Sequence, residues 1–143
     1  QTRMPIFLVT ARDRSQNKLT YLTITLKQDQ YYNYDFDTIN YGSTLLTGID
    51  VASSFAYKGT QAYGVLLTTN LNQNSLQAKL VDAQGNLTPL NDVVLPADIR
   101  PYYVFCKTFA NQGHCIIEGL GSVLQDFVLT IDEKNLSISA SKI

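Results

Sequence analysis

The chain is poor in charge. Of its 143 residues, Asp, Glu, Lys and Arg make up 16%, whereas an average soluble domain has about 25%. The net charge is −1 and the pI is about 5.7. Proteins that bind nucleic acid need a basic surface, which this composition does not supply, so we expect no nucleic-acid partner. Neutral hydrogen-bonding groups take the place of ions: there are 20 Asn and Gln and 23 Ser and Thr residues.

The sequence has no long hydrophobic run. A transmembrane helix needs about 18 or more consecutive apolar residues, so we expect no membrane span. No apolar stripe with helical spacing is long enough to predict a helix. The chain begins with Gln1 instead of Met, which fits an exported protein whose signal peptide has been removed.

Few side chains are suited to catalysis. There is one histidine, His114, and no tryptophan, and the glycines follow no phosphate-loop spacing. The acidic pairs Asp35/Asp37 and Asp132/Glu133 leave open a small hydrolase that uses two carboxylates. However, ten Asp against two Glu favours a role in turns, because Asp is a turn former. An enzyme is therefore the less favoured alternative.

Only two cysteines are present, Cys106 and Cys115, and the segment between them has the pattern of a β-hairpin. β-Rich runs flank residues 110–113, which tolerate the backbone angles of a turn. Folding about this turn places Cys106 opposite Cys115, at a separation that suits a disulfide, and Lys107 opposite His114. The pattern predicts a disulfide in a protein matured in an oxidising compartment, either secreted or periplasmic. Two free thiols in a cytosolic protein are the alternative.

Alternation with a period of two residues dominates the chain. In residues 19–27, Leu22, Ile24 and Leu26 share one face, and the other face carries a tyrosine and two threonines, which is the pattern of a half-buried strand. Turn-forming residues separate about nine or ten such segments, and Gly85 is placed for a positive φ in one turn. We predict one all-β domain over residues 1–143, an antiparallel β-sandwich, with a closed up-and-down β-barrel as the alternative.

The densest aromatic region spans residues 30–41. If residues 30–39 form a strand, Tyr32, Tyr34 and Phe36 point to one face, which we predict to be core. The other face offers a ring beside amide and carboxylate oxygens, groups that recognise ligands by stacking and hydrogen bonding. The predicted ligand-binding residues are Tyr31, Asn33, Asp35, Asp37 and Tyr41. A tyrosine-rich edge strand with solvated acids is the plainer interpretation.

Asn33, Asp35 and Asp37 are also candidate Ca²⁺ ligands, because this ion prefers oxygen donors. Alternate residues of a straight strand lie about 6.6 Å apart, too far to chelate one ion without a bend. We therefore predict no cofactor, with Ca²⁺ as the one ion left open.

These features predict an exported, non-catalytic recognition module that binds a glycan, a surface polymer or a host or partner protein through the Tyr/Asn/Asp-rich face. One alternative is a structural or assembly protein that self-associates or pairs with a partner through an exposed edge strand, for which the uncharged run at residues 63–69 is a candidate. The other alternative is the hydrolase that uses Asp carboxylates.

Overall fold

The structure is a computed structural model that describes residues 2–13, 15, 18–45, 51–69, 74–96, 99, 101–119 and 124–143. Within these residues there are twelve strands, and all their pairings are antiparallel. The same residues contain no helix, and so none that could cross a membrane. The all-β prediction is confirmed.

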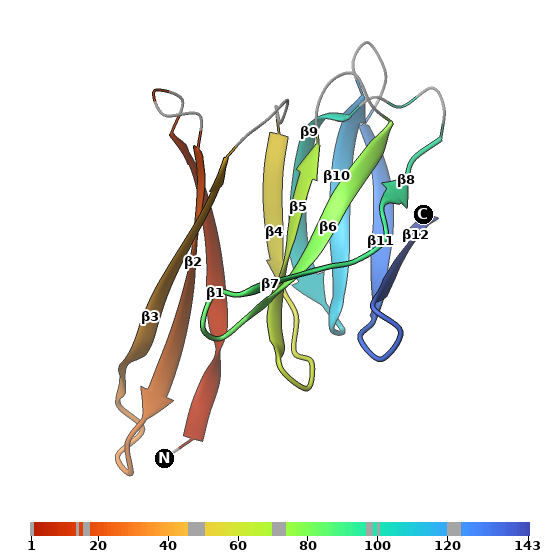
Figure 1. Ribbon diagram of the computed structural model, residues 1–143. Helices are drawn as coiled ribbons and strands as arrows, with labels where there is room; N and C mark the ends of the chain where they lie inside the picture. Colours follow the sequence, from red (N-terminus) through yellow and green to blue (C-terminus); the bar gives the residue numbers. More distant parts are fainter. Residues whose placement is uncertain are drawn as a thin grey trace.

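The strands form three sheets, each built from consecutive parts of the chain (Figure 1). The first sheet contains β1 (Thr2–Asp13), β2 (Lys18–Gln28) and β3 (Tyr34–Leu45). The second contains β4 (Val51–Ala56), β5 (Ala62–Thr69), β6 (Ser75–Asp82) and β7 (Leu87–Pro89), with β8 (Val93–Val94) also paired to β6. The third contains β9 (Pro101–Phe109), β10 (Gln112–Gly119), β11 (Leu124–Asp132) and β12 (Ser137–Lys142).

Twelve strands exceed the nine or ten expected from the sequence. β7 and β8 contain three and two residues, too few for an alternation of faces to be recognised. The sheets do not close on themselves in the described part of the chain, so the barrel alternative is wrong. Residues 63–69 belong to β5, which lies between β4 and β6. The lack of charge in this run had suggested an exposed edge strand, but the run lies inside the sheet.

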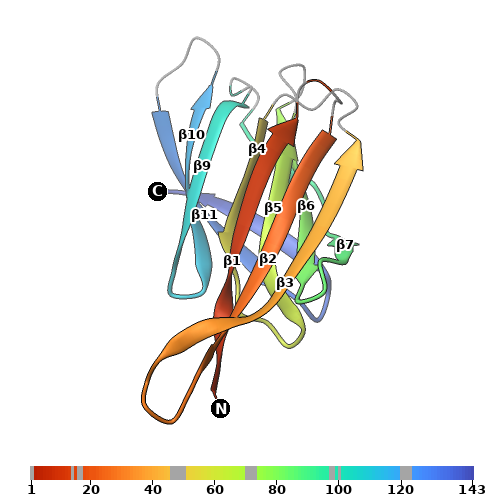
Figure 2. The ribbon, with the colours of Figure 1, turned by 90° about the vertical axis from the view of Figure 1, so that its left-hand side faces the viewer.

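The three sheets are layered, with the second sheet between the other two (Figures 1 and 2). The larger core lies between the second and third sheets, and a smaller one joins Leu19 and Tyr21 of the first sheet to the second. Because β5 faces both cores, Val65, Leu66 and Leu67 are buried in succession. A strand with one face in water alternates instead. The arrangement is that of a sandwich with an added layer.

The β9–β10 hairpin is as the sequence predicted. Cys106 and Cys115 are partners in its register and are joined by a disulfide, and Lys107 lies opposite His114. The connecting residues, Ala110 and Asn111, both have positive φ values, 50° and 57°, which is the geometry that matches the twist of two antiparallel strands. The disulfide lies in the larger core.

Two asparagine side chains link the second and third sheets, each by hydrogen bonds to both backbone groups of one residue, as a neighbouring strand would. The side chain of Asn111 accepts a hydrogen bond from the Lys58 amide at 2.8 Å and donates one to its carbonyl at 2.9 Å. Asn91 binds both backbone groups of Ile138 in the same way, at 2.8 and 2.9 Å. Because Ile138 belongs to the outermost strand of the third sheet, Asn91 also occupies part of an edge that could otherwise pair with another chain.

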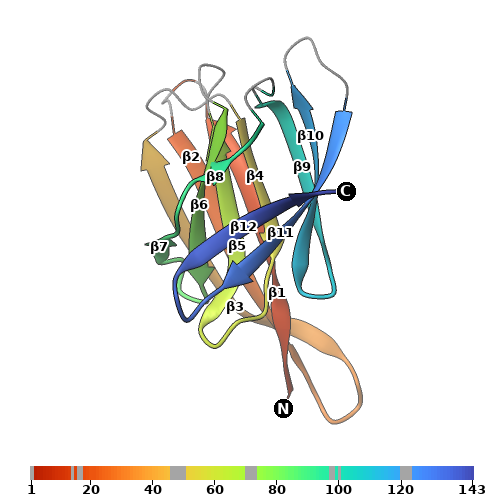
Figure 3. The same ribbon diagram turned by 90° about the vertical axis from the view of Figure 1, so that its right-hand side faces the viewer.

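A carboxylate provides a third link between these sheets, in the region that Figure 3 shows from the third-sheet side. Glu133, in the β11–β12 turn, accepts hydrogen bonds from the amides of Thr60, Gln61 and Ala62 at 2.7, 3.2 and 3.3 Å. Burial acts to raise the pKa of Glu133, but the hydrogen bonds from the three amides have the larger, opposite effect. The pKa of Glu133 therefore lies below its ordinary value of 4.5.

We expect Glu133→Gln to lower the free energy of unfolding by about 1–2 kcal/mol, since hydrogen bonds to a charged group contribute more than neutral ones. In the wild type this contribution is fully present above the unfolded-state pKa near 4.5 and disappears as the pH falls through the lower folded-state value. Urea unfolding between neutral and acidic pH measures both effects. If the variant and the wild type lose stability in parallel below pH 4.5, the hydrogen bonds of Glu133 do not stabilise the fold.

Candidate functional site: the β2–β3 hairpin

On β2, the face with Thr23 and Thr25 is buried, and the face with Leu22, Ile24 and Leu26 points outward. The side chains of β2 that are buried against the second sheet are Leu19, Tyr21, Thr23 and Thr25. The apolar residues Leu22, Ile24 and Leu26 face outward and are only half-buried. The inner face is polar because it holds the β6–β7 turn: Thr23 donates a hydrogen bond to the Ala83 carbonyl at 3.1 Å. The outer face is therefore left open for a contact from outside the fold.

The far end of the hairpin bends away from the body of the protein. The β1–β2 register shifts between Met4 and Phe7, and the β2–β3 register shifts between Thr25 and Leu26. Both irregularities lie at the same level of β2, and bulges bend a sheet and increase its twist. As a result the hairpin end projects beyond the second sheet (Figure 2). Residues 29–37 are all exposed.

The turn that connects β2 to β3, residues 29–33, is called the tip here. Its conformation is fixed by one carboxylate: Asp29 Oδ1 accepts hydrogen bonds from the amides of Tyr31 (2.8 Å) and Asn33 (2.9 Å), and Oδ2 accepts one from Asn33 Nδ2 (3.1 Å). These bonds lower the pKa of Asp29, those with Asn33 most. The tip is thus a defined structure at neutral pH, when Asp29 is ionised.

The β6–β7 turn repeats this arrangement with one informative difference. Asp82 accepts the amides of Gln84 (2.9 Å) and Asn86 (2.8 Å) and the side-chain amide of Asn86 (3.1 Å). The fourth residue of this turn is Gly85, with φ +86°, as the sequence predicted for it; the fourth residue of the tip is Tyr32, with φ +65°. Glycine adopts positive φ readily, whereas a side chain with a Cβ is strained there.

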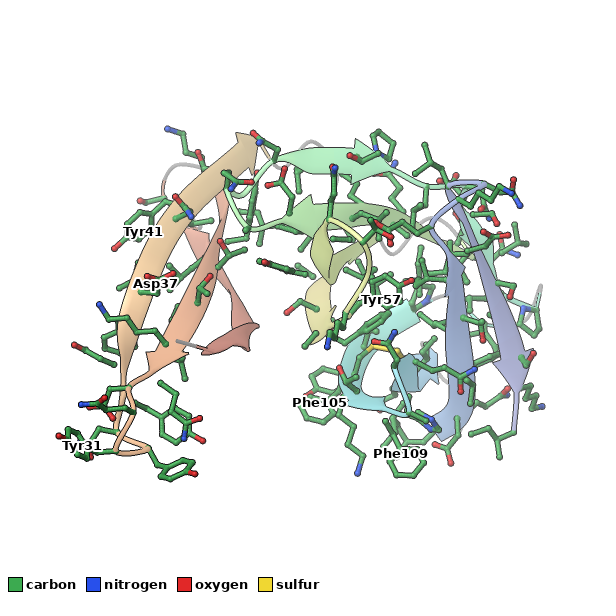
Figure 4. All side chains as sticks on the ribbon, turned by 90° about the horizontal axis from the view of Figure 1, so that it is seen from below. Tyr31, Asp37, Tyr41, Tyr57, Phe105 and Phe109 are labelled. Carbon is green, nitrogen blue, oxygen red and sulfur yellow. A yellow bond between two sulfur atoms is a disulfide. The ribbon has the colours of Figure 1, made fainter. Side chains whose placement is uncertain are left out.

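The side chain of Tyr32 adds little to the packing of the fold in return for this strain. Its side chain is 79% exposed, and that of its neighbour Tyr31 is 73% exposed. Figure 4 shows Tyr31 at the far end of the hairpin, well away from Phe105 and Phe109 on the third sheet. Backbone strain of this kind concentrates where a side chain is needed for function.

The predicted binding residues are distributed over three parts of the hairpin. Tyr31 and Asn33 lie in the tip, and Asp35 follows on β3, opposite Lys27. Asp37 is at the bulge and Tyr41 lies farther along β3 on the outer face (Figure 4). The tip therefore brings Tyr31 next to Tyr32, whereas Tyr41 is remote from both.

The prediction that Tyr32, Tyr34 and Phe36 are core is wrong. Tyr34 and Phe36 are 57% and 59% exposed. The strand begins only at Tyr34, and the bulge at Asp37 reverses the alternation, so Tyr41 lies on the face of Tyr34 and Phe36 and not on that of Asp35, with which it was grouped. The outer face of the first sheet has no layer above it among the described residues.

The proposed Ca²⁺ ligands are not gathered in one place. Asn33 is held by Asp29 within the tip, and Asp35 Oδ1 accepts the amide of Phe36 at 2.8 Å. Among the described residues, no three Asp, Glu, His or Cys side chains are grouped as a metal site would require.

Of the two carboxylate pairs considered for hydrolysis, Asp132 and Glu133 have structural partners. Glu133 lines an open pocket of about 450 Å³ together with Asp82 and Lys134. Glu133 is bound by three amides, and Asp82 is bound within its turn. Asp132 accepts hydrogen bonds from Asn135, and these lower its pKa. The lowered pKa values of Asp132 and Glu133 do not suit a general acid, which would need a raised pKa.

The comparisons with known proteins add no relative: no family model matches the chain, and neither a curated protein nor a solved structure matches it significantly. The function must therefore be inferred from the chain's own geometry.

Proposed function

We propose that this chain is a non-catalytic recognition protein that contacts a partner protein through the tip of the β2–β3 hairpin. The observation that carries the proposal is Tyr32: it takes the backbone position that Gly85 takes in the matching turn, although its ring is exposed. A strained position whose side chain packs little against the fold supports a contact outside the fold.

The chemistry of the tip suits protein recognition. Tyrosine gives a large, rigid and amphipathic contact area with little loss of side-chain entropy, which is why it is abundant in binding loops. Tyr31 and Tyr32 are presented by a turn that Asp29 has already ordered, and preorganisation of this kind reduces the entropic cost of binding.

A carbohydrate is the alternative ligand, and the hydrogen bonds within the tip favour a protein over it. The polar groups that would fix sugar hydroxyls, those of Asp29 and Asn33, already bond to each other. The groups that the tip offers to a ligand are chiefly the exposed rings of Tyr31 and Tyr32, and exposed aromatic side chains are enriched in protein interfaces.

We further propose that the protein acts outside the cytosol. The Cys106–Cys115 disulfide supports a secreted or periplasmic location, because such bonds persist in oxidising compartments.

The test is a comparison of two double variants on a displayed peptide and protein library and on a glycan array. Tyr31→Ser/Tyr32→Ser removes the tip rings. Tyr103→Ser/Phe105→Ser is the matched control, since those rings are 50% and 54% exposed on the third sheet. We expect ligands whose affinity falls at least about tenfold with the first variant and is unchanged with the second. Ligands that bind both variants equally would refute the proposal, and tip-dependent binding to glycans alone would replace the protein partner with a carbohydrate.

A further inference from the structure

The outward side chains of β2 and β3 form a continuous apolar ladder, a surface distinct from the tip. Four cross-strand pairs of the β2–β3 register lie on this face, which Figure 2 shows from the front. They are Leu22–Tyr41, Ile24–Ile39, Leu26–Phe36 and Gln28–Tyr34. Tyr41 is the most exposed of these side chains, at 74%. None of the eight is charged.

The water-facing side of β2 and β3 is thus more apolar than their side packed against the protein. Single exposed apolar residues are ordinary, but a contiguous set containing three aromatic rings marks an interaction surface. We propose that the ladder of one copy packs against the ladder of a second copy, face to face and with the hairpins antiparallel about a two-fold axis. This proposal does not depend on the tip's function.

The distribution of charge favours a second copy in this orientation. Because the ladder is uncharged, no like charges meet when it packs against itself. At one end of the sheet stands Lys18, exposed and in step with Leu22 and Ile24; the register brings Arg12 and Asp13 to the same end, and the three residues together have a net charge of +1. At the other end, residues 27–37 contain three Asp and one Lys, and Arg3 lies opposite Lys27, so this end has a net charge of −1. A two-fold axis across the ladder brings each acidic end near the other copy's Lys18, whereas a parallel arrangement would oppose like charges.

The available area indicates a small interface, and small interfaces are typically weak and transient. An aromatic side chain buries about 200 Å², so the exposed parts of Tyr34, Phe36 and Tyr41 offer roughly 400 Å² per copy. A standard interface uses roughly 800 Å² per partner. The three rings supply about half of this area. Ile39 and the half-buried ladder residues of β2 add a smaller area than the rings do. We therefore expect a weak dimer, with a Kd of the order of 10 µM.

Analytical ultracentrifugation of the full chain over concentrations on both sides of that Kd tests the proposal. We expect a monomer–dimer equilibrium that Ile39→Ser/Tyr41→Ser weakens at least about tenfold. Tyr103→Ser/Phe105→Ser, which changes exposed rings on the third sheet, is expected to leave it unchanged. Since all four side chains are exposed, circular dichroism and melting should match the wild type in both variants, and this check separates lost association from lost folding.

Lys18→Gln reports the orientation. In the antiparallel dimer it removes an attraction and weakens association, most at low salt; in a parallel dimer it removes a repulsion and strengthens association. A monomer at all concentrations, a dimer that the ladder variant does not weaken, or a dimer strengthened by Lys18→Gln would each overturn the inference. None of these outcomes bears on binding by Tyr31 and Tyr32, which lie outside the ladder.

Discussion

Replacing Tyr32 by glycine is expected to leave the protein as stable as before, or more stable by up to about 1 kcal/mol, and to reduce ligand affinity at least about tenfold. The two effects have separate causes. Glycine relieves the left-handed strain at φ +65°, although part of that gain is offset by its greater freedom in the unfolded chain. Binding is lost because the ring that contacts the partner is removed. Urea unfolding and titration with a tip-dependent ligand measure the two quantities.

The matching turn supplies the control for Tyr32→Gly. Gly85→Ala introduces a side chain at φ +86°, and its Cβ would meet the Tyr41 carbonyl group at 3.6 Å and the Asn40 Cβ at 3.9 Å, which are ordinary contact distances. We therefore expect a loss of about 1 kcal/mol from backbone strain alone, with unchanged affinity for tip ligands. If Tyr32→Gly destabilised the protein as Gly85→Ala does, Tyr32 would have a structural role and the argument from strain would fail.

Removing the disulfide is expected to have the largest effect on stability. The bond closes a loop between residues nine apart in sequence, for which the chain-entropy estimate is about 2–3 kcal/mol. Cys106→Ala/Cys115→Ala should lower the free energy of unfolding by about this amount or somewhat more, because both sulfurs are buried in the larger core and their removal leaves a small cavity. Denaturant unfolding with and without a reducing agent measures it.

The double cysteine variant also provides its own control, because reducing agent should destabilise the wild type and have no effect on the variant. An equal midpoint for oxidised and reduced wild type would show that the cross-link adds nothing to the pairing of β9 with β10. Reaction of both thiols with an alkylating agent in the unreduced, unfolded protein would show that no disulfide forms, and would remove the support for an extracellular location.

Sequence patterns predicted the turns and hairpins in which the paired residues are close in sequence. The β9–β10 register followed from the turn residues and from the symmetry of Cys106 and Cys115 about them. The turn at Gly85 followed from the conformational freedom of glycine. In both cases a short segment contains all the information, because the partners are close in sequence.

The burial of each strand face could not be predicted in the same way, because it depends on which layers lie above and below. β2 was recognised as half-buried, but the face that packs is the one carrying Thr23, since that threonine meets the β6–β7 turn 60 residues away. The apolar face of β2 and β3, with Phe36 and Tyr41, remains outside. Polarity alone would have assigned these faces in the opposite sense.

The tip was misread because a turn was taken for strand. The region was identified by its tyrosines, but the Asp29-to-Asn33 spacing, repeated at Asp82 and Asn86, was the signal of a turn. Comparing the two five-residue segments would have placed Tyr32 where Gly85 stands, at a position that favours glycine.

Photo-crosslinking shows whether the tip itself touches the partner. A photoreactive phenylalanine analogue is placed at Tyr31 in one variant and at Phe105 in another, both exposed positions (Figure 4), and each protein is irradiated with a ligand selected for tip-dependent binding. We expect a covalent adduct from position 31 and none from position 105. Equal yields from both positions, or an adduct from position 105 alone, would show that the tip is not the contact surface.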